Sequence, residues 1–366
     1  MWRFVLISFF VWRIALFFIV WAGNMFVPQR IGFLGPSVWA NFDGVHYLSI
    51  AQNGYLRYQE AFFPFYPLLV RFLAKTIFFD NYLWSGLFIS HLAFFASLIV
   101  FYKLASLEFG EKVAKMAVVG LLIFPTSFFF GSFYTESLFL LLILASFYAA
   151  KKEKWLWAGI FGGLASTTKL VGVFLLPALL WQYWRLHKDK FNNLTMKQFS
   201  NLFWLLLVPS GLISYMLYLS NLVGDSLAFI HAQPAFGAQR TGGEVILLPQ
   251  VYWRYLKIFF TVSFGNYDFW VALLEFSFFN LALFSLWRAW RLKMQFSYLA
   301  FSVLALIGPT FTGTLSSIPR YTLVLFPIFI LYGLIKNRGF RATLFIFSFL
   351  LLAALTILFT RGFFVA

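Results

Sequence analysis

Long apolar runs separated by short basic clusters recur along the whole chain, and this pattern constrains the fold more than any other feature. The runs at 4–26 and 83–102 reach the ~18–20 residues with which an α-helix crosses ~30 Å of hydrocarbon. Only structures that pair every backbone polar group internally cross lipid. The sequence therefore predicts an all-α, polytopic integral membrane bundle of about 10–11 transmembrane helices. Further spans are expected near 116–131, 133–150, 199–223, 266–287, 298–314, 321–335 and 342–360.

The basic clusters predict how the bundle is oriented, because cytoplasmic loops carry an excess of lysine and arginine. The segments between these clusters must then lie outside, where they hold the candidate site. We expect the first outer loop at 27–82 and a second large outer loop at 224–265, which could cap the site. The clusters are Lys103/Lys112/Lys115, Lys151/Lys152/Lys154, Arg185/Lys188/Lys190/Lys197, Arg288/Arg291/Lys293 and Lys336/Arg338/Arg341.

Composition excludes several classes of function. The net charge of +16 falls in short clusters between apolar runs, which is typical of orientation signals, so no nucleic-acid partner is expected. The chain contains no cysteine, which excludes disulfides, thiolate metal sites and cysteine nucleophiles. No metalloprotease, nucleotide-binding or hydrolase motif occurs in a supporting context.

Two segments do not fit simple spans. Arg3 and the cluster that begins at Lys103 are both predicted to be cytoplasmic, so the chain between them must cross the membrane an even number of times. Three apolar runs lie between them, at 4–26, 62–79 and 83–102, so one of the three cannot cross. The run at 62–79 contains Arg71 and Lys75, and we interpret it as re-entrant or interfacial on the outer side. The segment 155–184 is interrupted by a Ser-Thr-Thr-Lys patch that ends at Lys169. Ionisable groups at membrane depth are tolerated where they line a cavity, so this patch predicts a buried polar site.

Besides Lys169, three places along the chain carry candidate chemistry, and two further residues are weaker candidates. If 43–52 is a helix, Asp43 and His46 lie on one face at i, i+3; the alternative is a solvated interfacial loop. Glu136 opens an apolar helix, where a carboxylate is also favourable for purely structural reasons. Arg320 either anchors its turn at the head groups or holds a phosphate. His91 is interpreted as a packing histidine, and Asp268 is a weak candidate.

Carboxylates and cations on one side of the membrane suit transfer of a group from a lipid phosphate. Departure of a lipid phosphate needs cationic stabilisation, for which Lys169 and Arg320 are candidates, while the incoming hydroxyl benefits from one base.

Three motifs stand out along the chain: Phe42-Asp43-Gly44-Val45-His46-Tyr47 with Phe62-Phe63-Pro64-Phe65-Tyr66-Pro67, then Tyr134-Thr135-Glu136-Ser137-Leu138-Phe139, then Ala165-Ser166-Thr167-Thr168-Lys169-Leu170-Val171-Gly172. They resemble motifs of the PIG-V type of GPI mannosyltransferase, within the GT-C class of membrane glycosyltransferases. The last motif carries Lys169 where the family usually has arginine, which keeps the positive charge but loses the forked pair of donors of a guanidinium.

The resemblance implies a single GT-C-type domain over 1–366 that moves a hexose, with mannose favoured, from a polyprenyl-phosphate sugar donor with inversion. It implies a catalytic aspartate in the first outer loop, which is Asp43 in this sequence. Beyond the donor, the expected partners are membrane lipids and a glycan or lipid acceptor, and no cofactor or bound metal is expected. Substrate contacts are expected from His46, Tyr47, Tyr66, Tyr134, Glu136, Lys169 and Arg320.

Other interpretations remain open at this point. Intramembrane charges also mark transporters and lipid flippases, but these often show internal repeats, which we do not find. A structural membrane subunit would leave Asp43, Glu136 and Lys169 without convergence in space. The only glycosylation sequon, at 193–195, falls in a predicted cytoplasmic loop. We therefore expect a prokaryotic plasma membrane, with the site facing outside.

Overall fold

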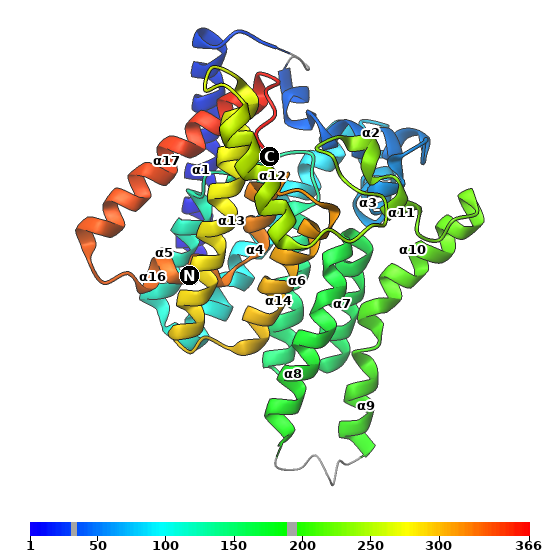
Figure 1. The fold of residues 1–366 in the computed structure, drawn as a ribbon. Coiled ribbons are helices and arrows are strands. Elements are labelled where there is room, and N and C mark those ends of the chain that lie inside the picture. The colour runs from blue at the N-terminus through cyan, green and yellow to red at the C-terminus, as the bar shows by residue number, and fades with distance from the viewer. Residues whose placement is uncertain (31–34, 189–195) are drawn as a thin grey trace. The chain divides into compact units, whose positions relative to one another are not determined.

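Helices account for all the regular secondary structure in the parts of the chain that the structure, a computed structural model, describes: residues 1–30, 35–188 and 196–366 (Figure 1). The predicted sequon at 193–195 and Lys190 lie outside these residues. The chain divides into two units, and the first consists of Met1–Gly54, Tyr66–Leu140 and Ser317–Ala366. The second consists of Tyr55–Phe65 and Leu141–Ser316.

The first unit brings together the N-terminal part of the chain and its last fifty residues. Phenylalanine rings fill its interior; Phe94 and Phe130, for example, stack with their centroids 4.3 Å apart. Its elements are α1 (Trp2–Phe26), η1 (Gly35–Ala40), α2 (Asp43–Asn53), α3 (Phe65–Thr76), α4 (Tyr82–Phe109), α5 (Glu111–Leu122), η3 (Ser127–Gly131), the start of α6 (Glu136–Lys151), α15 (Ile318–Tyr321), η8 (Thr322–Val324), α16 (Pro327–Leu334) and α17 (Arg338–Thr360).

The second unit is built from the middle of the chain. It contains η2 (Gln59–Ala61), the rest of α6, α7 (Trp155–Thr168), η4 (Leu170–Phe174), α8 (Leu175–His187), α9 (Met196–Trp204), α10 (Leu207–Val223), α11 (Ala228–His231), η6 (Gln233–Phe236), α12 (Leu248–Thr261), α13 (Tyr267–Arg291), α14 (Phe296–Ile307) and η7 (Gly308–Thr312). The predicted outer loop 224–265 thus contains helical segments, of which α12 is the longest.

Five helices among the described residues are long and apolar enough to cross a membrane, so the chain is an integral membrane protein. Large apolar side chains such as Ile7, Phe17 and Trp21 are exposed on α1, as lipid contact requires. Other predicted spans are divided into shorter helices, so the expected total of about 10–11 crossings stays a prediction. The five are Trp2–Phe26, Tyr82–Phe109, Ser200–Val223, Tyr267–Arg291 and Arg338–Thr360.

The predicted interruption at Ser166–Lys169 is present. The hydroxyls of Ser166, Thr167 and Thr168 donate to backbone carbonyls three or four residues earlier, at 2.9, 2.8 and 2.7 Å. Such bonds compete with the helical ladder, and α7 ends where Lys169 adopts an extended backbone with φ −152° and ψ 145°. At ~1.5 Å per residue, α7 and α8 are both shorter than the ~30 Å hydrocarbon layer.

Helix α3, in the predicted first outer loop, has 12 residues, or about 18 Å of helix, which is too short to cross. It buries Tyr66 and Val70 while exposing Leu68 and Phe72. Arg71 on α3 reaches α2, where its Nε and Nη2 atoms donate to the carbonyls of Ala51 at 2.7 Å and Ile50 at 2.8 Å. A cation therefore caps the C-terminal end of α2, which is electrostatically favourable.

Glycines let α7 approach both the end of α9 and α10 at backbone distance within the second unit. A Cβ atom placed on Gly211 would lie 2.1 Å from the carbonyl oxygen of Gly163, and one on Gly159 would lie 2.1 Å from that of Trp204. Small residues permit such close helix packing in membranes.

We expect Gly211→Val to lower the free energy of unfolding by about 1–3 kcal/mol, because the added atoms force two backbones apart. Gly265→Ala is the matched control, because the nearest atom to its new Cβ is the Ser263 hydroxyl at 3.8 Å. Thermal unfolding of the purified protein in detergent measures both. Equal melting temperatures for the two variants would contradict this account of the α7–α10 contact.

Candidate active site

Asp43 is the first residue of α2, which runs to Asn53, so the segment 43–52 is a helix and not the alternative interfacial loop. The preceding Phe42 has φ 55°, a backbone conformation that is unfavourable for a bulky residue. Its ring packs against Phe359 and Phe364 with centroids 5.8 and 5.6 Å away, which holds this turn in place. The carboxylate of Asp43 therefore lies at a helix N-terminus, where the helix dipole favours negative charge.

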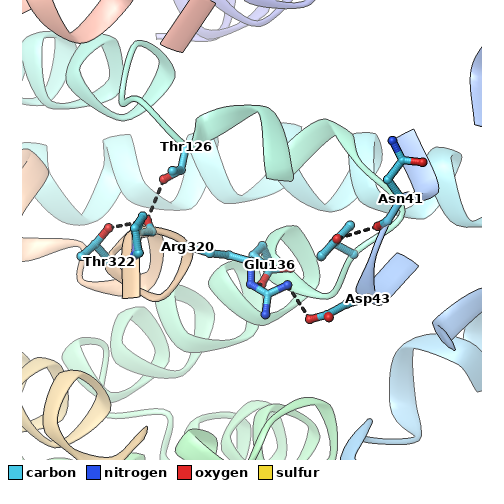
Figure 2. Close-up of polar contacts among 8 residues, drawn as sticks. Asn41, Asp43, Thr126, Glu136, Arg320 and Thr322 are labelled. Atoms are coloured by element: carbon cyan, nitrogen blue, oxygen red, sulfur yellow. Dashed lines mark hydrogen bonds and ion pairs between the residues drawn. The ribbon is translucent and has the colours of Figure 1, made fainter. Parts of the chain in front are cut away.

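Asp43, Glu136 and Arg320 meet within the first unit, although they are far apart in the sequence. The Arg320 Nη1 atom lies 2.6 Å from Asp43 Oδ2, and its Nε atom lies 3.4 Å from Glu136 Oε1 (Figure 2). Each residue comes from a different short element or helix start: α2, α6 and α15. Each of the three residues was predicted separately as a candidate from the sequence, and the structure brings them into contact.

The three side chains differ strongly in exposure. Glu136 is 1% exposed, Arg320 is 7% exposed and Asp43 is 29% exposed. Moving an ion out of water costs several kcal/mol unless it is paired, so the guanidinium and the Glu136 carboxylate depend on each other. Asp43 is the most exposed member of the group.

Aromatic rings surround the guanidinium. The Cζ atom of Arg320 lies 5.3 Å from the ring centroid of Tyr134 and 5.6 Å from those of Phe129 and Tyr321. Cation–π attraction adds to the ion pairs. Burial on its own lowers the pKa of Arg320, but Asp43 and Glu136 outweigh this and hold it well above its ordinary value.

Backbone hydrogen bonds fix the turn that carries Arg320. The hydroxyls of Thr126 and Thr322 both donate to the carbonyl of Pro319, at 2.8 and 2.7 Å (Figure 2). The turn is entered through Ser317, whose φ is 67°. The sequence did not indicate a positioning role for Thr126, because its partner lies 193 residues further along the chain.

The segment on the other side of the group is fixed in the same way. Tyr134 donates its hydroxyl to the carbonyl of Asn41 at 2.7 Å, and the Asn41 amide donates to the carbonyl of Phe359 at 3.0 Å. The sequence missed Asn41 as a positioning residue.

The predicted tyrosines are buried and occupied by contacts within the protein. Tyr66 contacts the carbonyl of Gly86 and the hydroxyl of Ser90, each at 3.0 Å. Tyr47 is 6% exposed and packs edge-on against Tyr66, with ring centroids 5.7 Å apart. Substrate contacts by Tyr47, Tyr66 and Tyr134 stay predictions, and the structure gives each of them a packing role.

His46 is half-buried on α2, one turn after Asp43. Burial lowers its pKa below the ordinary value, and the nearby Asp43 carboxylate offsets this only partly. The imidazole is therefore neutral at pH 7, when it can donate one hydrogen bond and accept another.

The remaining candidates have other local surroundings in the parts of the chain that carry them. Lys169 is half-buried at the break between α7 and η4 and belongs to the second unit, so its expected approach to Asp43 stays a prediction.

His91 is a packing histidine, as predicted: its Nδ1 atom lies 2.6 Å from the carbonyl of Leu87, and its ring lies edge-on to Phe9. Asp268 is exposed in the first turn of α13. Within 1–30, 35–188 and 196–366, no three His, Asp or Glu residues form a group that could hold a metal ion.

Comparison with known proteins identifies the class of fold. No protein-family model matches the sequence, and no curated protein is similar to it. Among solved structures, ArnT from Cupriavidus metallidurans bound to undecaprenyl phosphate has a TM-score of 0.55 at 14% identity, covering 96% of this chain and 63% of ArnT. Its apo state has a TM-score of 0.51 at 14% identity, covering 98% of this chain and 75% of ArnT.

A second neighbour is the apo oligosaccharyltransferase of Archaeoglobus fulgidus, with a TM-score of 0.51 at 14% identity, covering all of this chain (100%) and 56% of that protein. At such identities the likeness concerns the fold. The prediction of an all-helical membrane fold of GT-C type is confirmed. The PIG-V subtype stays a prediction.

We expect Arg320→Leu to lower the free energy of unfolding by about 3–5 kcal/mol, because it removes the cation beside a buried carboxylate. Adding Glu136→Leu should restore most of the loss, since both buried charges are then gone and Asp43 keeps contact with solvent. Chemical denaturation of the detergent-solubilised protein measures both. A double variant no more stable than Arg320→Leu would show that Glu136 does not depend on Arg320.

We expect His46 to make the protein less stable as pH falls. An unfolded histidine titrates near pH ~6.5, whereas the pKa of folded His46 is lower. The unfolded state therefore binds more protons as the pH falls from 7 towards 5, which favours unfolding. The melting temperature of His46→Gln should fall less over this range than that of the unaltered protein. If the melting temperatures of the two proteins fell equally with pH, the result would contradict burial of a neutral imidazole.

Proposed function

We propose that this protein transfers a hexose from a polyprenyl-phosphate sugar to a hydroxyl of a lipid-linked or cell-surface acceptor, with inversion, and that Asp43 is the general base. The observation that carries the proposal is the graded exposure of the charged group: one reachable carboxylate is paired with a buried arginine that a second, fully buried carboxylate holds in place. A base must be fixed in direction and open to its substrate, and Asp43 meets both conditions.

In this mechanism the acceptor hydroxyl gives its proton to Asp43 as its oxygen attacks the anomeric carbon of the sugar. The bond between that carbon and the phosphate oxygen breaks, and the lipid phosphate leaves with the electron pair. Inversion follows from attack on the opposite face. The departing phosphate is a good leaving group and needs no general acid, but its developing charge needs cations.

Arg320 links the two events. While Asp43 is ionised, the guanidinium is balanced by two carboxylates at 2.6 and 3.4 Å. When Asp43 takes the proton, one of these charges is neutralised, and the positive field of Arg320 becomes available as the phosphate gains charge. Lys169, which the sequence predicts as a second cation, belongs to the second unit, and its part in the reaction stays a prediction.

Neutral His46 orients a hydroxyl of the sugar or the acceptor. Glu136 acts through Arg320, because its 1% exposure leaves no room for direct contact with substrate. The likeness of fold to ArnT, whose crystal structure contains undecaprenyl phosphate, supports a polyprenyl phosphate as the leaving lipid. The resemblance to PIG-V-type enzymes favours mannose, and the charge pattern favours a site on the non-cytoplasmic face of a prokaryotic plasma membrane.

We expect Asp43→Asn to lower the turnover number by about 10²–10⁴-fold, as loss of a general base does, while binding of the donor is retained. The assay incubates the purified protein in nanodiscs with a panel of polyprenyl-phosphate sugars and follows the release of polyprenyl phosphate. Asp268→Asn is the matched control, because Asp268 also lies in the first turn of a helix but is exposed on α13. Full transfer by a folded Asp43→Asn variant would remove Asp43 as the base. Transport of the donor without release of polyprenyl phosphate would instead identify a flippase.

A further inference from the structure

A buried tyrosine–glutamate pair in the second unit has no part in the mechanism above. The hydroxyl of Tyr255, on α12, donates to Glu275 Oε2, on α13, at 2.5 Å. Both residues are 4% exposed. Glu275 lies eight residues into a helix that is apolar enough to cross the membrane, about 12 Å from its start. An ionisable group at such a depth is costly, and it marks a functional position by default.

The pair binds the chain segment 314–316. The Leu315 amide donates to the Tyr255 hydroxyl at 3.1 Å, and that hydroxyl also lies 3.3 Å from Thr314 Oγ1. Thr314 Oγ1 in turn accepts from the Ser316 amide at 3.1 Å. Two neighbouring backbone amides thus depend on one buried hydroxyl cluster.

The same segment lies between two residues with positive φ. Gly313 has φ 94°, and its carbonyl accepts from Arg254 Nη1 at 2.8 Å; Ser317 has φ 67°. The second of these is unfavourable for a residue with a side chain, so its neighbours must hold it in place. Arg320 follows Ser317 after two residues, within the same short turn.

A purely structural tie between α12 and α13 would not need a carboxylate. Tyr252 and Asn280 already join these two helices, through a neutral hydrogen bond of 2.8 Å. What distinguishes the Tyr255–Glu275 pair is its bond to the backbone that leads into Arg320.

We propose that Tyr255 and Glu275 are positioning residues for Arg320: they fix the backbone of 314–316 and so determine where the following residues place the guanidinium. The hydrogen bonds of the pair lie within the second unit, and the peptide chain itself carries their effect into the first. The consequence for activity rests on the transfer reaction proposed above, whereas the consequence for the backbone does not.

Tyr255→Phe and Tyr252→Phe form a matched pair, because each removes one hydroxyl between the same two helices and only the first hydroxyl reaches segment 314–316. We expect Tyr255→Phe to lower the turnover number by up to about 10²-fold, the scale for a misplaced catalytic group, with the Michaelis constant for the donor unchanged. Tyr252→Phe should keep the original turnover. Equal turnover of the two variants would overturn the proposal.

Glu275→Gln and Glu275→Leu test the carboxylate. Glutamine keeps an oxygen that accepts from Tyr255, so we expect most of the activity to remain; leucine removes the acceptor and should reproduce Tyr255→Phe. In an Arg320→Lys background, Tyr255→Phe should cost nothing more, because residues that act through one another are non-additive. Full additivity would show that Tyr255 acts elsewhere, and would overturn its assignment to Arg320.

Hydrogen exchange separates this proposal from the transfer reaction. We expect the amides of Leu315 and Ser316 to exchange faster in Tyr255→Phe and at the original rate in Tyr252→Phe. Unchanged exchange in Tyr255→Phe would overturn the positioning role. If the unaltered protein transfers no sugar from any donor of the panel, the proposed function fails, and the exchange rates still decide whether the pair holds the segment.

Discussion

The ion pair between Arg320 and Glu136 is the interaction on which the first unit depends. Both side chains are almost completely buried, at 7% and 1% exposure, so the Glu136 carboxylate is not tolerable without the guanidinium beside it. Keeping them together requires three distant parts of the chain to converge, and the hydrogen bonds of Thr126 to Pro319 and of Tyr134 to Asn41 hold those parts in place. Asp43 is the most exposed residue of the group, and its ion pair with Arg320 fixes the position of its carboxylate.

The fold and the three charged residues that meet in the first unit were largely predictable, for the same physical reason. Only 11% of the residues are charged, and each ionisable group near a membrane boundary is costly. Asp43, Glu136 and Arg320 could therefore each be predicted as a functional candidate from its own position in the sequence. The break at Lys169 was visible because three successive hydroxyl residues precede it. What the sequence could not predict was exposure, which arises from packing between segments far apart: it grouped Glu136 with the substrate contacts, and the structure buries it.

Other features of the structure were not predicted from the sequence, because the interacting residues are far apart along the chain or the sequence signal is weak. Nothing local to Thr126 or Asn41 indicates that each one bonds a backbone group of a distant segment. Glu275 did carry a signal, as an isolated carboxylate in the predicted span 266–287, and the same argument that selected Glu136 would have found it. The crossings were harder to count, since helices interrupted by proline, glycine or hydroxyl residues read as continuous apolar runs.

The order of the three charges along the chain has a consequence for biosynthesis. Glu136 leaves the ribosome 184 residues before Arg320. At ~5–20 residues per second, translation delivers the cation roughly 10 to 40 s after the carboxylate. Throughout that interval Glu136 has no arginine partner, so its side chain must be protonated, hydrated or held by an insertase. The core around Phe129 and Tyr134 can pack only after the segment that carries Arg320 has been made.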